Sequence, residues 1–118
     1  MKQVFEMIGM PGLSGWVSWH KAILQGDTVI AQVSSEIINP MGLNHWYDSL
    51  GDHKVEKANI AYTLASLVYK LKLKQKDNEF IKTWLSQPND LLKQNVPLEL
   101  LKSSFTSTYV FTAAERLA

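Results

Sequence analysis

The side chains that most often bind metals are scattered in this sequence. The three histidines, His20, His45 and His53, have no histidine or carboxylate four residues away. That spacing is the one that puts two metal ligands on the same face of a helix. We therefore expect no metal site and no cofactor, and we interpret these residues as ordinary surface or boundary histidines.

The pattern of carboxylates does not indicate an active site either. The nearest thing to an acidic grouping consists of Glu36, Asp48, Asp52 and Glu56. These residues fall at the ends of expected helices and in loops, where capping and the helix dipole account for them. Hydrolysis needs a nucleophile beside a base or two facing carboxylates, and the sequence has neither a glycine-rich phosphate loop nor a serine elbow. We predict no catalytic residue and expect that the protein is not an enzyme.

Recognition of DNA would depend mainly on cations. Twelve Lys and Arg against eleven Asp and Glu give a formal charge of +1, whereas DNA-binding proteins commonly neutralise roughly 6 to 10 phosphates. Four residues could still contact DNA, the first two at base edges and the others at phosphates: Asn44, His45, Lys54 and Lys57. However, residues 43–50 contain no Lys or Arg and do contain Asp48. Charge thus predicts weak binding, and the alternative is that Trp46 simply packs this segment into the core.

Four lysines, Lys70, Lys72, Lys74 and Lys76, crowd the end of the longest expected helix. Cations complement the negative end of a helix dipole. We interpret this run as a solvated helix end and not as a phosphate-binding patch.

The expected elements are nearly all helices. Apolar spacing predicts helices over residues 2–10, 15–25 and 54–74, and the last carries a broad buried stripe that makes it the central core helix. Residues 28–38 fit a helix, but residues 21–34, with β-branched residues around the Gly26-Asp27 turn, also fit a β-hairpin. A turn over residues 39–42 and a short helix over residues 43–50, closed by Gly51, complete a helix-turn-helix outline.

Residues 84–101 contain several residues that favour the start or the end of a helix. A helix bearing Phe80, Ile81, Trp84 and Leu85 should end before Pro88, since the residue preceding a proline is pushed out of the α region. Asn89 can then cap a short turn, Asn95 can cap the next helix, and Pro97 suits that helix's first turn. Beyond it we expect helix over residues 98–104 and a closing helix from residue 108, with a strand over residues 106–112 as the alternative.

The pattern in residues 84–101 is Trp-Leu, two residues, Pro-Asn, two residues, Leu, four residues, Pro, two residues, Leu-Leu. Its residues are Trp84, Leu85, Pro88, Asn89, Leu92, Pro97, Leu100 and Leu101. This block, with the Ala- and Leu-rich helix before it, resembles the C-terminal toxin-binding domain of the Xre/MbcA/ParS antitoxin family over roughly residues 55–105. The resemblance implies an all-α fold and favours a helix over residues 28–38.

The resemblance also implies a function. Family members neutralise a cognate RES-domain toxin, which consumes or transfers from NAD, by blocking its active-site entrance, and many repress their own promoter. Carried over, residues 1–53 would form a degenerate helix-turn-helix unit with operator DNA as its ligand, and residues 54–118 a toxin-binding unit. The alternatives are a transcriptional regulator whose main ligand is DNA, and an interaction domain without a toxin.

Partner contacts are expected among residues that a core does not need. They are Lys102, Phe105, Tyr109, Glu115 and Arg116, since an exposed aromatic beside an arginine is typical of interfaces. No cysteine, no signal-like N-terminus and no long apolar run occur. We therefore expect a cytoplasmic protein without a membrane segment that folds alone or as a small homo-oligomer.

Overall fold

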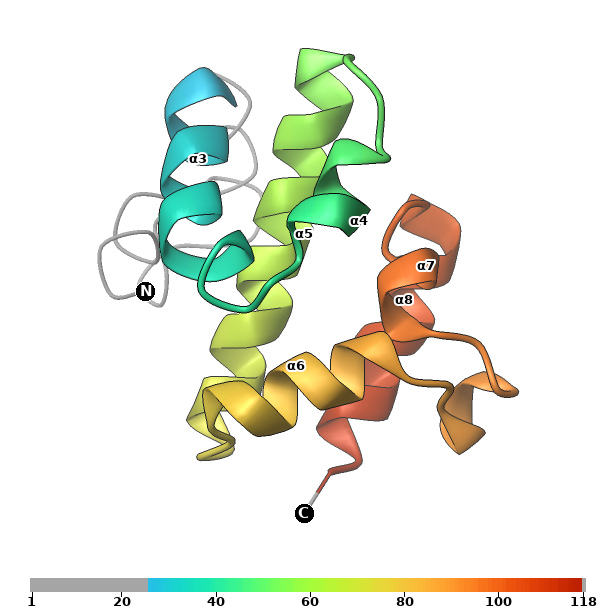
Figure 1. The fold of residues 1–118 in the computed structure, drawn as a ribbon. Coiled ribbons are helices and arrows are strands. Elements are labelled where there is room, and N and C mark those ends of the chain that lie inside the picture. Colours follow the sequence, from blue (N-terminus) through green and yellow to red (C-terminus); the bar gives the residue numbers. More distant parts are fainter. Residues whose placement is uncertain (1–25, 118) are drawn as a thin grey trace. The chain divides into compact units, whose positions relative to one another are not determined.

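The computed structural model describes residues 26–117, apart from the side chains of residues 26–29, 54 and 104. The described chain is built from six α-helices: α3 (Gly26–Val33), α4 (Asn44–Asp48), α5 (Lys54–Leu73), α6 (Asn78–Ser86), α7 (Pro97–Leu100) and α8 (Ser104–Glu115) (Figure 1). A π-helical turn, η1 (Ser34–Ile38), and a 3-10 turn, η2 (Asp90–Leu92), join them. No strand occurs within residues 26–117, so the predicted all-α class is confirmed. The helices predicted over residues 2–10 and 15–25 lie outside the described residues.

The chain forms two compact units, Met1–Ser66 and Leu67–Ala118, whose division falls inside α5. The sequence-based division between residues 53 and 54 stays a prediction.

In the first unit, residues 26–38 are helical throughout. Val33, Ile37 and Ile38 are fully buried, which a helix achieves because residues four or five apart share a face. The Asn39 amide donates to the Ser34 carbonyl at 2.8 Å and closes the wider π turn. The β-hairpin alternative is therefore wrong over residues 26–34, since burial of one helical face outweighs the β preference of the branched residues, and its residues 21–25 lie outside the described residues.

A tight turn leads from η1 into α4. Gly42 has a φ of +68°, a conformation that glycine adopts without steric cost. Helix α4 contacts η1 and buries Trp46 and Tyr47, so the prediction that Trp46 packs into the core is confirmed. The helix is shorter than the predicted 43–50, because the Ser49 hydroxyl donates back to the Trp46 carbonyl where the helix ends.

Helix α5 carries the predicted buried stripe. Its first-unit part buries Ala61, Leu64 and Ala65, and its second-unit part buries Leu67, Val68 and Leu71. Ile60 is only half-buried. The observed helix, Lys54–Leu73, matches the predicted 54–74 closely.

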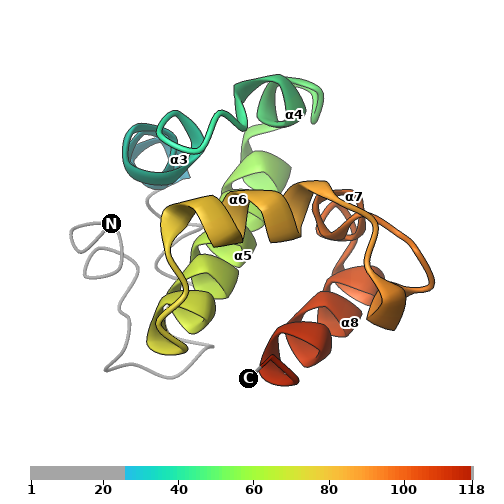
Figure 2. The ribbon, with the colours of Figure 1, turned by 60° about the horizontal axis from the view of Figure 1, so that its bottom comes forward.

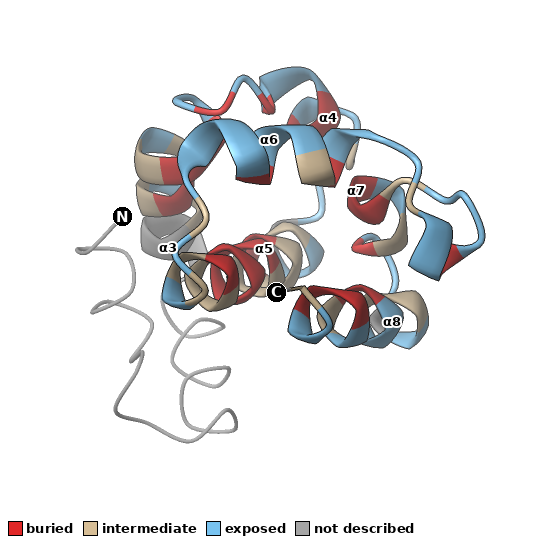
Figure 3. Cartoon of the chain, turned by 90° about the horizontal axis from the view of Figure 1, so that it is seen from below, coloured by how far each residue is buried: buried red, intermediate tan, exposed pale blue. Residues whose placement is uncertain are grey.

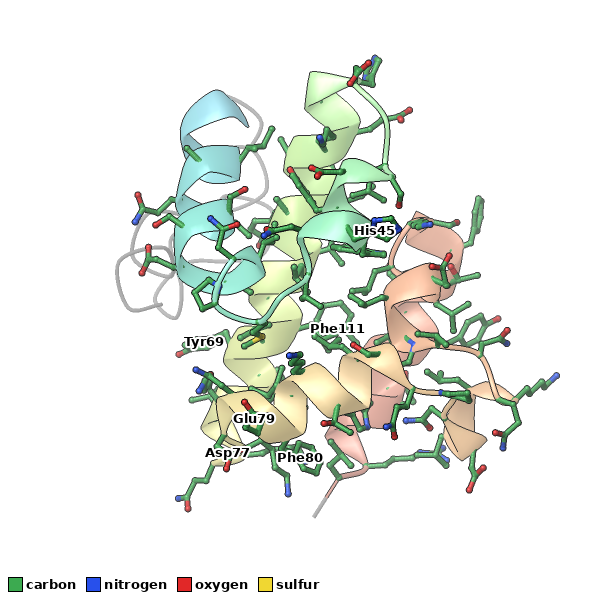
Figure 4. The ribbon with its side chains drawn as sticks, viewed as in Figure 1. His45, Tyr69, Asp77, Glu79, Phe80 and Phe111 are labelled. Carbon is green, nitrogen blue, oxygen red and sulfur yellow. The ribbon has the colours of Figure 1, made fainter. Side chains whose placement is uncertain are left out.

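In the second unit, α6 begins where the Asp77 carboxylate accepts the Phe80 amide at 2.8 Å (Figure 4). Ile81 and Leu85 are buried, as expected. Phe80 is 37% exposed and lies under the Lys76 ammonium, 4.8 Å from the ring centroid. The helix ends at Ser86, two residues before Pro88, as the proline predicts.

The helix caps and helix starts after α6 match the prediction only in part. The Asn89 side chain accepts the Leu91 amide at 2.9 Å and caps η2, and Pro97 is the first residue of α7. Asn95 does not cap α7. Its amide donates instead to the Leu92 carbonyl at 2.8 Å, and Val96 precedes the helix without a side-chain cap.

The last helices divide differently from the prediction. Helix α7 ends at Leu100, and Ser103 accepts the Phe105 amide at 3.2 Å to begin α8 four residues before the expected start. The predicted helix over residues 98–104 is confirmed only over residues 98–100, the closing helix is confirmed over residues 108–115, and the alternative strand over residues 106–112 is wrong. Helix α7 contacts α6 and α8, and Figure 2 shows it at the end of α6 beside the start of α8. Within the described residues, no helix combines the length and apolarity that crossing a membrane needs.

Candidate functional site

Helix α8 exposes two aromatic side chains one turn apart. Phe105 is 88% exposed and Tyr109 is 64% exposed. At 3.6 residues per turn, Thr112 and Arg116 continue the same line, and we call these four residues the aromatic face of α8. The buried residues of α8, which include Val110 and Ala114, occupy another side (Figure 3).

A cleft of about 300 Å³ adjoins this face. Its lining residues are Leu91, Leu92, Lys93, Asn95, Leu100, Thr106 and Tyr109. Tyr109 therefore belongs both to the aromatic face and to the cleft. Leu91 is 53% exposed, whereas its neighbour Leu92 is buried. The cleft thus combines an accessible apolar wall with a buried apolar floor.

The loop that forms one wall of the cleft is tightly constrained. The Asn89 amide donates to the Asn95 carbonyl at 3.1 Å, and the Gln94 amide donates to the Asn89 carbonyl at 2.9 Å. Lys93 and Gln94 have φ values of +55° and +69°. A non-glycine residue in this left-handed region costs roughly 1 to 2 kcal/mol. Such strain persists only where surrounding contacts over-determine the backbone, so the loop holds a fixed shape.

The charges around the cleft fall into paired and unpaired groups. Lys102 pairs with Glu99 at 3.0 Å, and Glu115 pairs with Lys70. The hydrogen bond and the charge of Lys70 lower the pKa of Glu115. Two of the predicted partner residues, Lys102 and Glu115, are therefore engaged by their own unit. Among the described residues, no carboxylate pairs with Arg116 or with Lys93.

The lysines at the end of α5 make hydrogen bonds to other residues of the second unit. The Lys74 ammonium donates to the carbonyls of Glu115 and Leu117 at 2.8 and 2.7 Å. Lys72 donates to the Asn78 side chain at 2.6 Å. These half-buried lysines differ from the solvated helix end expected from the sequence. Lys74, together with Lys70, holds the end of α8 in place by supplying the cations that helix C-termini favour.

The residues predicted to contact DNA do not form a basic cluster. Asn44 and His45 are exposed on α4, which has only five residues (Figure 4). The Lys57 ammonium lies 4.6 Å from the centroid of the Tyr47 ring, and the Tyr47 hydroxyl donates to the Lys57 carbonyl at 3.4 Å. Burial raises the pKa of the Tyr47 phenol to about 12. The Lys54 side chain lies outside the described residues.

The eight residues of the sequence pattern are mainly structural. Leu85, Leu92, Pro97 and Leu101 are buried, Trp84, Asn89 and Leu100 are half-buried, and Pro88 is exposed. Sequence reasoning missed Leu91, Lys93 and Thr106 as site residues. One available signal was the adjacent leucines of the short turn 90–92, since a three-residue turn rarely buries two neighbouring side chains.

Groups of three or more acidic, histidine or cysteine side chains placed to hold a metal do not occur in residues 26–117. The aromatic face and the cleft together offer exposed apolar surface that the second unit does not use. No protein-family model, no curated protein and no solved structure matches the chain.

Proposed function

We propose that this protein is an antitoxin of the Xre/MbcA/ParS kind, which binds a cognate RES-type toxin and neutralises it by covering the entrance of its NAD site. The observation that carries the proposal is the exposed aromatic face of α8 beside an apolar cleft. The residue pattern over 84–101 supplies the class of partner. The proposal implies a cytoplasmic location, because the toxin's NAD lies there.

Exposed aromatics of this size favour a protein partner. Removing a Phe side chain from water contributes about 1.5 to 3 kcal/mol, and the fold leaves Phe105 almost entirely in water. Aromatic residues and arginine are enriched among the few side chains that dominate binding energy at interfaces. Tyr109 and Arg116 continue the line from Phe105, so one partner surface can bury all three.

The proposed mechanism is steric and uses the side of α8. Lys70 and Lys74 hold the end of that helix, from Glu115 to Leu117. We therefore propose that the aromatic face on the side of the helix covers the toxin. Covering an active-site entrance requires no catalytic group in this chain.

The test is co-expression with the product of the adjacent gene. Wild-type protein should restore growth and cellular NAD and should co-purify with that product. The double variant F105S/Y109S should lose at least 30-fold in affinity, since hot-spot residues contribute about 2 kcal/mol or more. A matched control, V55S/L73S, replaces two other exposed apolar residues of α5 and should bind as the wild type does.

Two results would refute the proposal. One is failure of the wild-type protein to bind or neutralise the adjacent-gene product. The other is unchanged neutralisation by F105S/Y109S. If the protein instead binds its own promoter with a steep salt dependence, the main ligand is DNA, and the helix-turn-helix outline of residues 26–48 accounts for it.

A further inference from the structure

We infer that the cleft beside α8 receives one apolar side chain from a partner protein, and that Lys93 on its wall binds a carboxylate next to that side chain. This inference rests on the proposed function and names the chemistry that the partner must present. The chemistry is an exposed Leu or Phe flanked by Asp or Glu.

The apolar part of the inference follows from the lining. Leu91 and Tyr109 stand exposed on the walls, Leu100 is half-buried, and Leu92 is buried. The volume of about 300 Å³ lies at the lower end of the roughly 300 to 1,000 Å³ typical of ligand clefts. A space of this size suits one or two side chains and not an extended segment.

The walls of the cleft are fixed before a partner arrives. The Asn89 and Asn95 backbones pair at the base of the loop, and the Gln94 side chain donates to Asp90 across it. On the opposite wall, the Thr106 hydroxyl donates to the Leu100 carbonyl at 2.5 Å. Preformed walls lower the entropic cost of binding, because little has to be ordered in the complex.

The charge part of the inference follows from Lys93. It is the one charged residue among the seven that line the cleft. Its side chain is exposed and makes no ion pair with a carboxylate among the described residues, while Glu99 pairs with Lys102 and Asp90 accepts a hydrogen bond from the Gln94 amide. An ammonium beside an apolar cleft favours a carboxylate on the incoming chain and disfavours a cation there.

The first experiment uses defined peptides with the full-length protein. The probe is acetylated Ser-Glu-Phe-Leu-Glu-Ser amide, and its two controls replace both Glu by Lys or both apolar residues by Ala. Titration followed by amide NMR should shift the signals of Leu91, Thr106 and Tyr109 with the acidic apolar peptide. Both control peptides should bind at least 5-fold more weakly.

Matched variants then test the two parts separately. L91S should weaken binding of the acidic apolar peptide at least 5-fold. K93Q should remove the preference for Glu over Lys, while its backbone stays unchanged. The controls L73S and K82Q replace an exposed leucine and an exposed lysine that do not line the cleft, and they should bind as the wild type does.

The outcomes separate this inference from the proposed function. Absence of peptide binding, equal binding of the Lys peptide, or unchanged binding by L91S overturns the cleft inference. Self-association of the wild-type protein that L91S abolishes also overturns it, because the occupant is then a second copy. If the peptides bind as expected but the adjacent-gene product does not, the proposed function fails and the cleft inference stands.

Discussion

Helices α4 and α8 place their aromatic residues differently. In α4, Trp46 and Tyr47 are 8% and 5% exposed, whereas in α8, Phe105 and Tyr109 are 88% and 64% exposed. The apolar surface of α4 already stabilises the first unit. The exposed rings of Phe105 and Tyr109 contribute little to the second unit and remain available to a partner.

The cations of the two regions differ in the same way. Lys57, a candidate for contacting DNA, lies over the Tyr47 ring, whereas Lys93 stands beside the cleft without a carboxylate among the described residues. Neither aromatic content nor charge count in the sequence distinguishes the two regions. The solvent exposure of their side chains does distinguish the two regions, and it is the basis for placing partner binding on α8.

The largest expected effect compares the aromatic residues directly. W46A should lower the free energy of unfolding by about 3 to 5 kcal/mol, because it leaves a cavity in a packed core. F105A should change it by no more than about 0.5 kcal/mol, because the ring is exposed. Urea unfolding followed by circular dichroism measures both. A cost above about 1 kcal/mol for F105A would show that the ring is packed in the free protein and would break the comparison.

A second effect concerns the buried phenol of Tyr47, which belongs to α4. Since burial raises the pKa of Tyr47 from 10.0 to about 12, the unfolded chain ionises first as the pH rises. The stabilisation is complete below pH 10 and is lost as the pH rises to about 12, with a total of roughly 2 to 3 kcal/mol. Urea unfolding from pH 8 to 11 should show about half of this loss. The variant Y47F should lack it, and an equal loss in Y47F would refute burial as the cause.

A smaller effect separates folding from binding at the cleft. K93G should raise the free energy of unfolding by about 0.5 to 1 kcal/mol. Glycine adopts a φ of +55° without strain, and this gain outweighs the cost of its greater conformational entropy in the unfolded chain. The same change should weaken binding of the acidic apolar peptide. Thermal unfolding and the NMR titration measure the two quantities. Loss of stability in K93G would mean that the Lys93 side chain makes contacts that stabilise the loop.

The smallest expected effect lies at the end of α8. Lys70 lowers the pKa of Glu115, so their pair stabilises the fold above the ordinary glutamate pKa of 4.5 and is lost as the pH falls below it. Exposed pairs contribute little, so the loss of stability should be slight. NMR titration of the Glu115 carboxyl should show its pKa rising in K70Q and unchanged in K82Q. An unchanged pKa of Glu115 in K70Q would show that Lys70 does not interact with Glu115 and does not help to hold α8.

Several features could be predicted from the sequence because they depend on neighbours a few residues away. The long helix over residues 54–74 follows from its apolar stripe, and Pro88 ends the helix before it through a steric effect on the preceding residue. The cap at Asn89 and the place of Pro97 follow from local hydrogen bonding. The all-α class is the sum of such local effects.

Tertiary structure decided the features that depend on distant residues. The chemistry of Asn95 suits a cap, yet its amide bonds to Leu92 because the loop closes on itself. Lys74 meets Glu115 and Leu117, which are more than forty positions further along the chain, so its role could not be read from its neighbours. Leu91 and Leu92 are the same residue type in adjacent positions, and only packing against the rest of the unit buries one and exposes the other. The sequence by itself determined the all-α class, the long helix and the helix end before Pro88, and the tertiary structure decided which side chains remain free to bind, because burial depends on partners that the chain brings together only when it folds.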